Sequence, residues 1–178
     1  MQSGIAISWR GRFTPGLKDL NKRIIIEGIV AALTRELEGY MRSAKAAHAE
    51  ATDEQSKAEN KYDTRGLEAS YLARGQSRQA LEVLQAIQAY QTLPLRAFSS
   101  HEPIDVGAVV ELEHSSERAC YFIGPRAGGT EVECEGAEVL VITPQSPMGQ
   151  QLVGRKQGEH VEIQIGRDKN VCQIAKVH

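Results

Sequence analysis

The chain has 178 residues, a formal net charge of −2, 41% hydrophobic and 25% charged residues, a composition typical of a globular protein and not of a disordered chain. The near-neutral charge counts against a protein that binds a nucleic-acid backbone directly, because that needs a basic surface. No apolar run approaches the roughly 18 residues of a membrane span. Three cysteines without CxxC spacing indicate neither a disulfide framework nor a zinc site. We therefore expect a cytoplasmic protein that holds no metal of its own.

The composition changes sharply along the chain. Residues 19–94 contain 13 Ala and 2 Val, whereas residues 103–178 contain 5 Ala and 10 Val. Alanine favours helix and valine favours strand. The sequence therefore predicts an α+β protein with an antiparallel helical hairpin over 19–94, a linker over 95–102 and a small β-rich domain over 103–178. Residues 1–18 carry glycine and proline without periodicity, and we expect a flexible extension there.

The first predicted helix carries a heptad seam, which is typical of a coiled coil. Its apolar residues recur at alternating spacings of four and three: Ile26, Val30, Leu33, Leu37, Tyr40, Ala44, Ala47 and Ala51. The seam residues shrink from isoleucine and leucine to alanine along the helix. We therefore expect the far end of the hairpin to be slender and less stable.

The second helix is predicted from about Ser56 to Leu93. Its apolar residues include Leu67, Tyr71, Ala73, Ala80, Leu81, Leu84 and Ile87, with Tyr71 expected to pack in the seam or near the tip. The large residues lie mostly toward its C-terminal end, which is the order that an antiparallel partner of the first helix requires. Between the helices, Ser56 and Glu59 have the spacing of a capping box that would begin the second helix.

Six strands and one short helix are predicted within 103–178, separated by glycine-containing or polar turns. The helix is predicted over about Pro147–Val153, with Pro147 in its first turn. The strand candidates are Val106–Leu112, Arg118–Ile123, Thr130–Cys134, Val139–Ile142, His160–Ile165 and Cys172–Val177.

Three segments of this β-rich part carry a family resemblance. Residues 146–161 read SPMGQQLVGRKQGEHV, which resembles the SPLG-x-ALLGK-x-x-GD-x-V signature of Gre-type transcription elongation factors. Ile104–Val110 resembles the I-x-x-G-S-x-V strand of that family, and Tyr121–Pro125 stands at its Y-x-I-V-G/P strand. The resemblance implies an FKBP-like fold for 103–178 and an antiparallel coiled coil before it, in agreement with the periodicity.

The resemblance also implies a partner. Gre-type factors bind bacterial RNA polymerase: the β domain docks at the rim of the secondary channel, and acids at the tip of the coiled coil help hold a catalytic magnesium ion, so that a backtracked transcript is cut. Carried onto this sequence, the tip acids are Asp53, Glu54 and Glu59. The polymerase-binding loop is Ser146, Pro147, Met148 and Gly149. The protein would then be a monomer that is not itself an enzyme, that shares Mg²⁺ with the polymerase, and that meets nucleic acid only through it.

The tip departs from the family's D-L-S-E-N-A-x-Y pattern, because Ser56 stands three residues before Glu59 where the family has aspartate. Two functions therefore stay open: stimulation of transcript cleavage, or occupation of the channel that inhibits or modulates the polymerase without cleavage. A third hypothesis, an FKBP-like prolyl isomerase, requires an aromatic-lined pocket. Residues 103–178 hold only Tyr121 and Phe122 as aromatics, and adjacent strand residues point to opposite faces.

Each candidate residue also has a purely structural interpretation. Glu59 fits a capping box, and Asp53 and Glu54 fit polar residues near a helix N-terminus. The loop 146–149 fits a turn with a helix cap. The basic residues that are candidates for contacting extruded RNA are Arg65, Arg74 and Arg78. For these, the alternative is a solvated helix face on which Arg78 pairs with Glu82.

Overall fold

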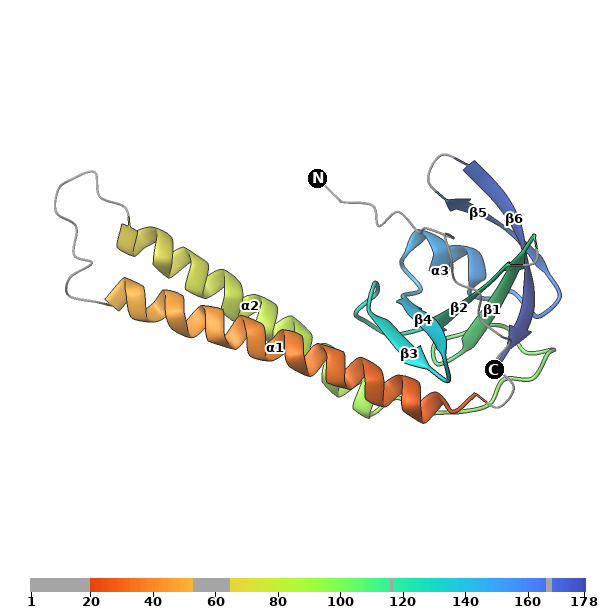
Figure 1. Ribbon diagram of the computed structural model, residues 1–178, viewed down its shortest axis with the longest axis horizontal. Helices are drawn as coiled ribbons and strands as arrows, with labels where there is room; N and C mark the ends of the chain where they lie inside the picture. The colour runs from red at the N-terminus through yellow and green to blue at the C-terminus, as the bar shows by residue number, and fades with distance from the viewer. Residues whose placement is uncertain (1–19, 53–64, 116, 166–167) are drawn as a thin grey trace. The chain divides into compact units, whose positions relative to one another are not determined.

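Figure 1 shows the computed structural model, which describes residues 20–52, 65–115, 117–165 and 168–178. The elements are α1 (Lys22–Thr52), α2 (Arg65–Gln91), β1 (Val109–His114), β2 (Glu117–Ile123), β3 (Glu131–Cys134), β4 (Ala137–Ile142), α3 (Pro147–Leu152), β5 (His160–Ile165) and β6 (Asp168–Val177). The predicted α+β class, with two helices followed by a six-stranded sheet and one short helix, is confirmed. The predictions for 1–18 and for the Ser56 capping box lie outside the described residues.

The described chain forms two compact units. The first, which we call the sheet unit, combines residues 20–30 with 89–178. The second, which we call the arm, lies within residues 31–88. The helix α1 therefore begins in the sheet unit and continues into the arm, and α2 ends in the sheet unit.

The arm is held by a narrow helical seam. On α1, Leu33 and Ala47 are buried, and Leu37, Tyr40 and Ala44 are half-buried, as the heptad pattern predicts. A hydrogen bond to the Glu36 carboxylate raises the pKa of Tyr40, and burial and the charges of Glu36 and of Glu82 on α2 raise it further. The two helices lie side by side at this level (Figure 1).

The seam of α2 differs from the prediction. Its covered residues also follow a heptad repeat, at Ala73, Gln76, Ala80, Val83, Ile87 and Tyr90. Tyr71, Leu81 and Leu84 are instead 66%, 54% and 40% exposed. Ala73, Ala80 and Ile87 were among the predicted apolar residues and are covered. The prediction was wrong for the other three because it listed apolar residues without a register, whereas the partner helix imposes a spacing of three and four.

The base of α1 also buries different residues from those predicted. Ile25 and Ile29 are fully buried, whereas Ile26 and Val30 are only partly covered. This part of α1 belongs to the sheet unit, where a Cβ at Gly28 would lie 3.4 Å from Val132 on β3. The buried residues at the base of α1 therefore precede the predicted seam positions by one residue. A single heptad pattern does not describe this change of face.

The six strands form one sheet in the order β3-β4-β2-β1-β6-β5, in which β2 and β4 are parallel and the other neighbours are antiparallel. The predicted strand over His160–Ile165 is confirmed, and most other bounds shift by a few residues. The first strand begins at Val109 instead of Val106, because Ala108 donates to Asp105 O and Gly107 has φ +91°, which makes a turn there.

Alternate residues of each strand fill the two faces of the sheet. One face, with Val110 and Leu112 of β1, packs against α3 in a single apolar cluster that includes Tyr121, Met148, Leu152 and Ile174. Val109 and Glu111 of β1 lie on the other face, as does Phe122 of β2, and all three are buried. The sheet unit is therefore buried on both faces of its central strands.

Candidate functional site

The predicted polymerase-binding loop forms the N-terminal cap of α3. The Ser146 hydroxyl accepts a hydrogen bond from Gly149 N at 3.0 Å and donates one to Thr143 O at 2.7 Å. Pro147 occupies the first turn, where its missing N–H costs nothing. Serine and proline are therefore explained by helix capping alone, as the structural interpretation of this loop predicts.

Gly149 is required by packing. A Cβ at this position would overlap the carbonyl oxygen of Thr143. Met148 and Gly149 are buried, Ser146 is half-buried and Pro147 is exposed. Of the four predicted binding residues, Pro147 therefore presents the most surface to a partner, while the other three shape the turn that presents it.

The rest of the family signature also has a structural role. Leu152 is fully buried in the core cluster. Gly154 and Gly158 have φ of +85° and +89°, which favours glycine at both turns. Gly154 N donates to Ile104 O, and Ile104 N donates to Arg155 O, both at 2.8 Å. The signature thus joins α3 to the segment that enters β1, which explains why its residues occur together with the first-strand motif.

The predicted tip acids Asp53, Glu54 and Glu59 lie outside the described residues. The helices α1 and α2 end and begin on either side of them, at Thr52 and Arg65. Arg65 is the first residue of α2, and its side chain is not described.

Arg74 and Arg78 are exposed on α2. The predicted pair of Arg78 with Glu82 is present at 3.3 Å between highly exposed side chains. This fits the solvated helix face that was the structural interpretation of the two arginines.

Sequence reasoning missed how Tyr90 anchors the end of α2. Tyr90 is 1% exposed, lies 6.3 Å from Phe122 between ring centroids and donates its hydroxyl hydrogen to Arg126 O at 2.6 Å. Burial raises the pKa of Tyr90, which keeps this donor protonated. A Cβ at Gly124 would overlap the Tyr90 hydroxyl, so the glycine of the Tyr121–Pro125 motif makes room for it. Gly124 was therefore the residue in the sequence that could have indicated this contact.

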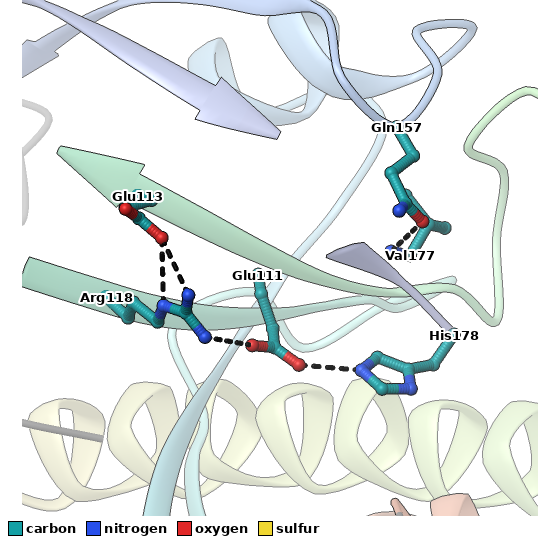
Figure 2. A network of polar contacts seen from close by, with 6 residues as sticks. All are labelled: Glu111, Glu113, Arg118, Gln157, Val177 and His178. Atoms are coloured by element: carbon teal, nitrogen blue, oxygen red, sulfur yellow. Dashed lines mark hydrogen bonds and ion pairs between the residues drawn. The ribbon is translucent and has the colours of Figure 1, made fainter. Parts of the chain in front are cut away.

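A buried polar network around Glu111 was also missed (Figure 2). Glu111 is 1% exposed, and its Oε1 lies 2.7 Å from His178 Nε2. Its other oxygen lies 3.9 Å from the Arg118 guanidinium, which also contacts Glu113 at 2.9 Å. Glu111 interrupts an apolar run in β1, and this interruption could have indicated a buried polar residue. Its partners could not be read from the sequence, because one lies on β2 and the other follows β6.

The remaining chemistry of the described residues is limited. They include no group of three or more His, Cys, Asp or Glu side chains that could hold a metal ion. Cys120, Cys134 and Cys172 are buried and form no disulfide with one another, and burial raises the pKa of Cys134 and Cys172, which disfavours the reactive thiolate. None of the helices, over the described ranges, is long and apolar enough to cross a membrane.

Comparisons with known proteins agree with the family resemblance. Residues 99–178 match the model of the C-terminal domain of the transcription elongation factors GreA/GreB. No curated protein sequence matches the chain.

Among solved structures, the chain is similar to the GreA factor homolog 1 (Gfh1) of Thermus thermophilus, with 22% identity, a TM-score of 0.37, and coverage of 84% of this chain and 94% of that one. Gfh1 of Thermus aquaticus has 20% identity, a TM-score of 0.37, and coverage of 85% and 95%. A GreA/GreB factor of Nitrosomonas europaea has 18% identity, a TM-score of 0.33, and coverage of 62% and 91%.

The family assignment rests on the match over 99–178, which includes every strand of the sheet, α3 and the motifs that carry the resemblance. Residues 99–178 are therefore a C-terminal domain of the type found in the GreA/GreB transcription elongation factors.

Proposed function

We propose that the protein binds bacterial RNA polymerase, with the sheet unit at the rim of the secondary channel and the arm inside it. One observation carries this proposal: a GreA/GreB C-terminal domain follows two helices of 31 and 27 residues that flank an acidic segment. Helices of this length extend roughly 40–47 Å at 1.5 Å per residue. The narrow seam of small residues keeps the pair slender, which suits insertion into a channel.

The proposed roles divide between the two ends. Pro147, presented by the cap of α3, contacts the polymerase together with Ser146. Asp53, Glu54 and Glu59 bring carboxylates to the polymerase active site, where carboxylate oxygen is the ligand type that Mg²⁺ prefers. A metal-bound water or hydroxide is the nucleophile that two-metal phosphodiester hydrolysis uses. In this proposal the chain has no catalytic activity alone, because the reacting centre belongs to the polymerase.

The test is a cleavage assay with the full chain and a backtracked complex of the cognate polymerase. We expect short 3′ RNA fragments, and we expect the triple change D53A/E54A/E59A to abolish them while binding persists. Glu27→Ala is the matched control, because it removes an exposed acid from α1 far along the chain from this segment. Cleavage that survives the triple change would overturn the assignment of the acids.

The alternative is a channel binder that inhibits or modulates the polymerase without cleavage. The observation that favours it is Ser56, together with Lys57 and Lys61, which place a neutral residue and two cations among the acids. In the same assay this function gives binding and slowed elongation with no fragments. The absence of any binding to the polymerase would contradict both functions.

The prolyl isomerase hypothesis loses its physical basis. Tyr121 is 2% exposed within the core cluster, and Phe122 is fully buried beside Tyr90. Both aromatics of 103–178 are therefore used in packing.

Docking through the α3 cap has its own test. Pro147→Asp places a charge on the exposed residue of the loop, and we expect it to weaken binding to the polymerase at least about tenfold, which is about 1.4 kcal/mol. Gln151→Ala, also exposed on α3, is the matched control and should bind normally. Equal affinities of the two variants would remove Pro147 from the interface.

A further inference from the structure

Lys22 joins three segments of the sheet unit. It is the first residue of α1, and its Nζ donates to Arg96 O at 2.6 Å and to Gly107 O at 2.9 Å. Arg96 lies in the segment after α2, and Gly107 lies in the turn that enters β1. One ammonium group therefore joins Lys22 to two backbone carbonyls that lie 74 and 85 positions further along the chain.

An aromatic ring completes this joint. Nζ of Lys22 lies 4.6 Å from the centroid of the Phe98 ring, and Cζ of Arg96 lies 3.8 Å from the same centroid. Phe98 is 6% exposed and belongs to the core cluster, so the ring is fixed. A cation near an aromatic ring is stabilised by its quadrupole. We call Lys22, Arg96, Phe98 and Gly107 the Lys22 joint.

The joint depends on the number of hydrogens and on the charge at Nζ. An ammonium has three hydrogens, enough for both carbonyl acceptors. An acylated lysine has one N–H and no charge, so it can satisfy only one of the two carbonyls and loses the attraction to the ring. Acylation of this one atom therefore removes most of the joint without changing the sequence.

We propose that Lys22 is an acylation site, modified by acyl phosphates, and that its acylation opens the joint between α1, the segment after α2 and the entry to β1. The neutral amine attacks the acyl carbon, the new C–N bond forms, and the C–O bond to phosphate breaks. Phosphate leaves, and the proton lost from nitrogen passes to water or to the leaving phosphate. The acyl phosphate supplies both the acyl group and the leaving group.

The surroundings of Lys22 favour this chemistry. Burial and the Arg96 charge lower the pKa of Lys22 to about 8, so more of the amine is neutral near physiological pH than in an ordinary lysine. The side chain is only half-buried, and its hydrogen bond to Arg96 O lies at the surface, which leaves one side open to a reagent. The Arg96 guanidinium beside it uses one nitrogen to pair with Glu102 at 2.9 Å, and its remaining N–H groups can attract the phosphate group.

The first test treats the full chain with acetyl phosphate and follows each lysine by peptide mass spectrometry from about pH 6.5 to 10. We expect Lys22 to be acetylated several-fold faster than the exposed Lys45 near pH 7.5, with a rate that levels off near pH 8. In the urea-denatured chain the Lys22 rate should keep rising toward pH 10, because the ordinary pKa of this side chain is 10.5. A folded Lys22 that reacts more slowly than Lys45 would overturn the proposal.

The second test measures the consequence by amide hydrogen exchange. Acetylated protein and Lys22→Gln should exchange several-fold faster than the unmodified chain in the segments around Arg96 and Gly107. Lys22→Arg, which keeps charge and donors, should exchange like the wild type, and Lys45→Gln controls for loss of a charge on α1. If Lys22→Gln does not fold, the acetylated wild type still gives the answer. Unchanged exchange after full acetylation of Lys22 would refute the opening. The proposal does not depend on polymerase binding.

Discussion

The sheet unit and the arm are stabilised on different scales. In the sheet unit, every strand contributes fully or nearly fully buried side chains, many of them large, and both faces of the central strands are covered. In the arm, the described side chains that are buried are Leu33, Ala47, Val83, Ala86 and Ile87, and none of them is fully buried. Because burial of apolar area provides most of the free energy of folding, the arm rests on far less of it per residue.

The arm has few large side chains between its two helices. Its far end is lined with alanine, and large apolar residues of α2 such as Tyr71 and Leu81 are exposed instead of filling the seam. A helical pair with so little core opens locally at low cost. Within the sheet unit, the first turns of α1 and the last turn of α2 contribute Ile29 and Tyr90, which are buried in that unit.

The largest expected effect is therefore a truncation in the core of the sheet unit. Leu112→Ala should lower the free energy of unfolding by about 3 kcal/mol, because the fully buried side chain leaves a cavity. Leu81→Ala, at a leucine of α2 that is 54% exposed, should change it by less than about 0.5 kcal/mol. Urea denaturation followed by circular dichroism measures both. Similar costs at the two leucines would contradict the difference between the units.

A smaller effect is expected within the polar network of the sheet unit. Glu111→Ala should cost about 2 kcal/mol, because it removes the acceptor for His178 and a neighbouring charge for Arg118 in a buried place. Glu113→Ala breaks a more exposed ion pair with the same arginine and should cost less than about 1 kcal/mol. Urea denaturation of both variants measures the two costs. Equal losses of unfolding free energy would mean that the buried position of Glu111 contributes nothing.

The sequence predicted the local patterns of both units better than their long-range contacts. The heptad pattern located the α1 seam at Leu33 and Ala47, and alternation with turns located the strand His160–Ile165. On α2 the apolar pattern included Ala80, which is covered, but also Leu81, which is exposed. The partner helix, not the side chain, decides which of the two is covered.

The candidate site was predictable to the extent that its motif encodes the fold. The loop from Ser146 was recognised as a cap, and the structure gives the reason for each glycine of the signature. The contacts of Glu111 with His178, and of Lys22 with Gly107, were not predictable, because they join residues 67 and 85 positions apart that only the folded sheet unit brings together. The tip acids lie outside the described residues and stay a prediction.

The sparse core of the arm predicts that a larger apolar residue in its seam stabilises it. Gln76 is half-buried within the α2 seam between Ala73 and Ala80. Gln76→Leu should stabilise the arm by about 1 kcal/mol by adding apolar burial, seen as slower hydrogen exchange of α2 amides. Gln79→Leu, exposed on the same helix, is the matched control and should leave exchange nearly unchanged. Faster exchange in Gln76→Leu would mean that the seam has no room for a larger apolar side chain.

The smallest expected effect concerns Lys22 and pH. The pKa of Lys22 is lowered to about 8 in the folded protein, from 10.5 in a free side chain. Between these values the unfolded chain binds more protons than the folded protein, so the free energy of unfolding rises with pH. The gain should stay below about 1 kcal/mol, because the half-exposed side chain is screened by solvent.

Lys22→Met isolates this contribution, because methionine does not titrate. Urea denaturation at a series of pH values should show the stability of the wild type rising relative to Lys22→Met from about pH 8 to 10.5. Tyr90 acts in the opposite direction above about pH 10, since its raised pKa makes the folded protein hold a proton that the unfolded chain loses. Both proteins share that contribution, and it cancels in the difference. A difference that is flat or falls over this range would show that Lys22 is not desolvated at the joint.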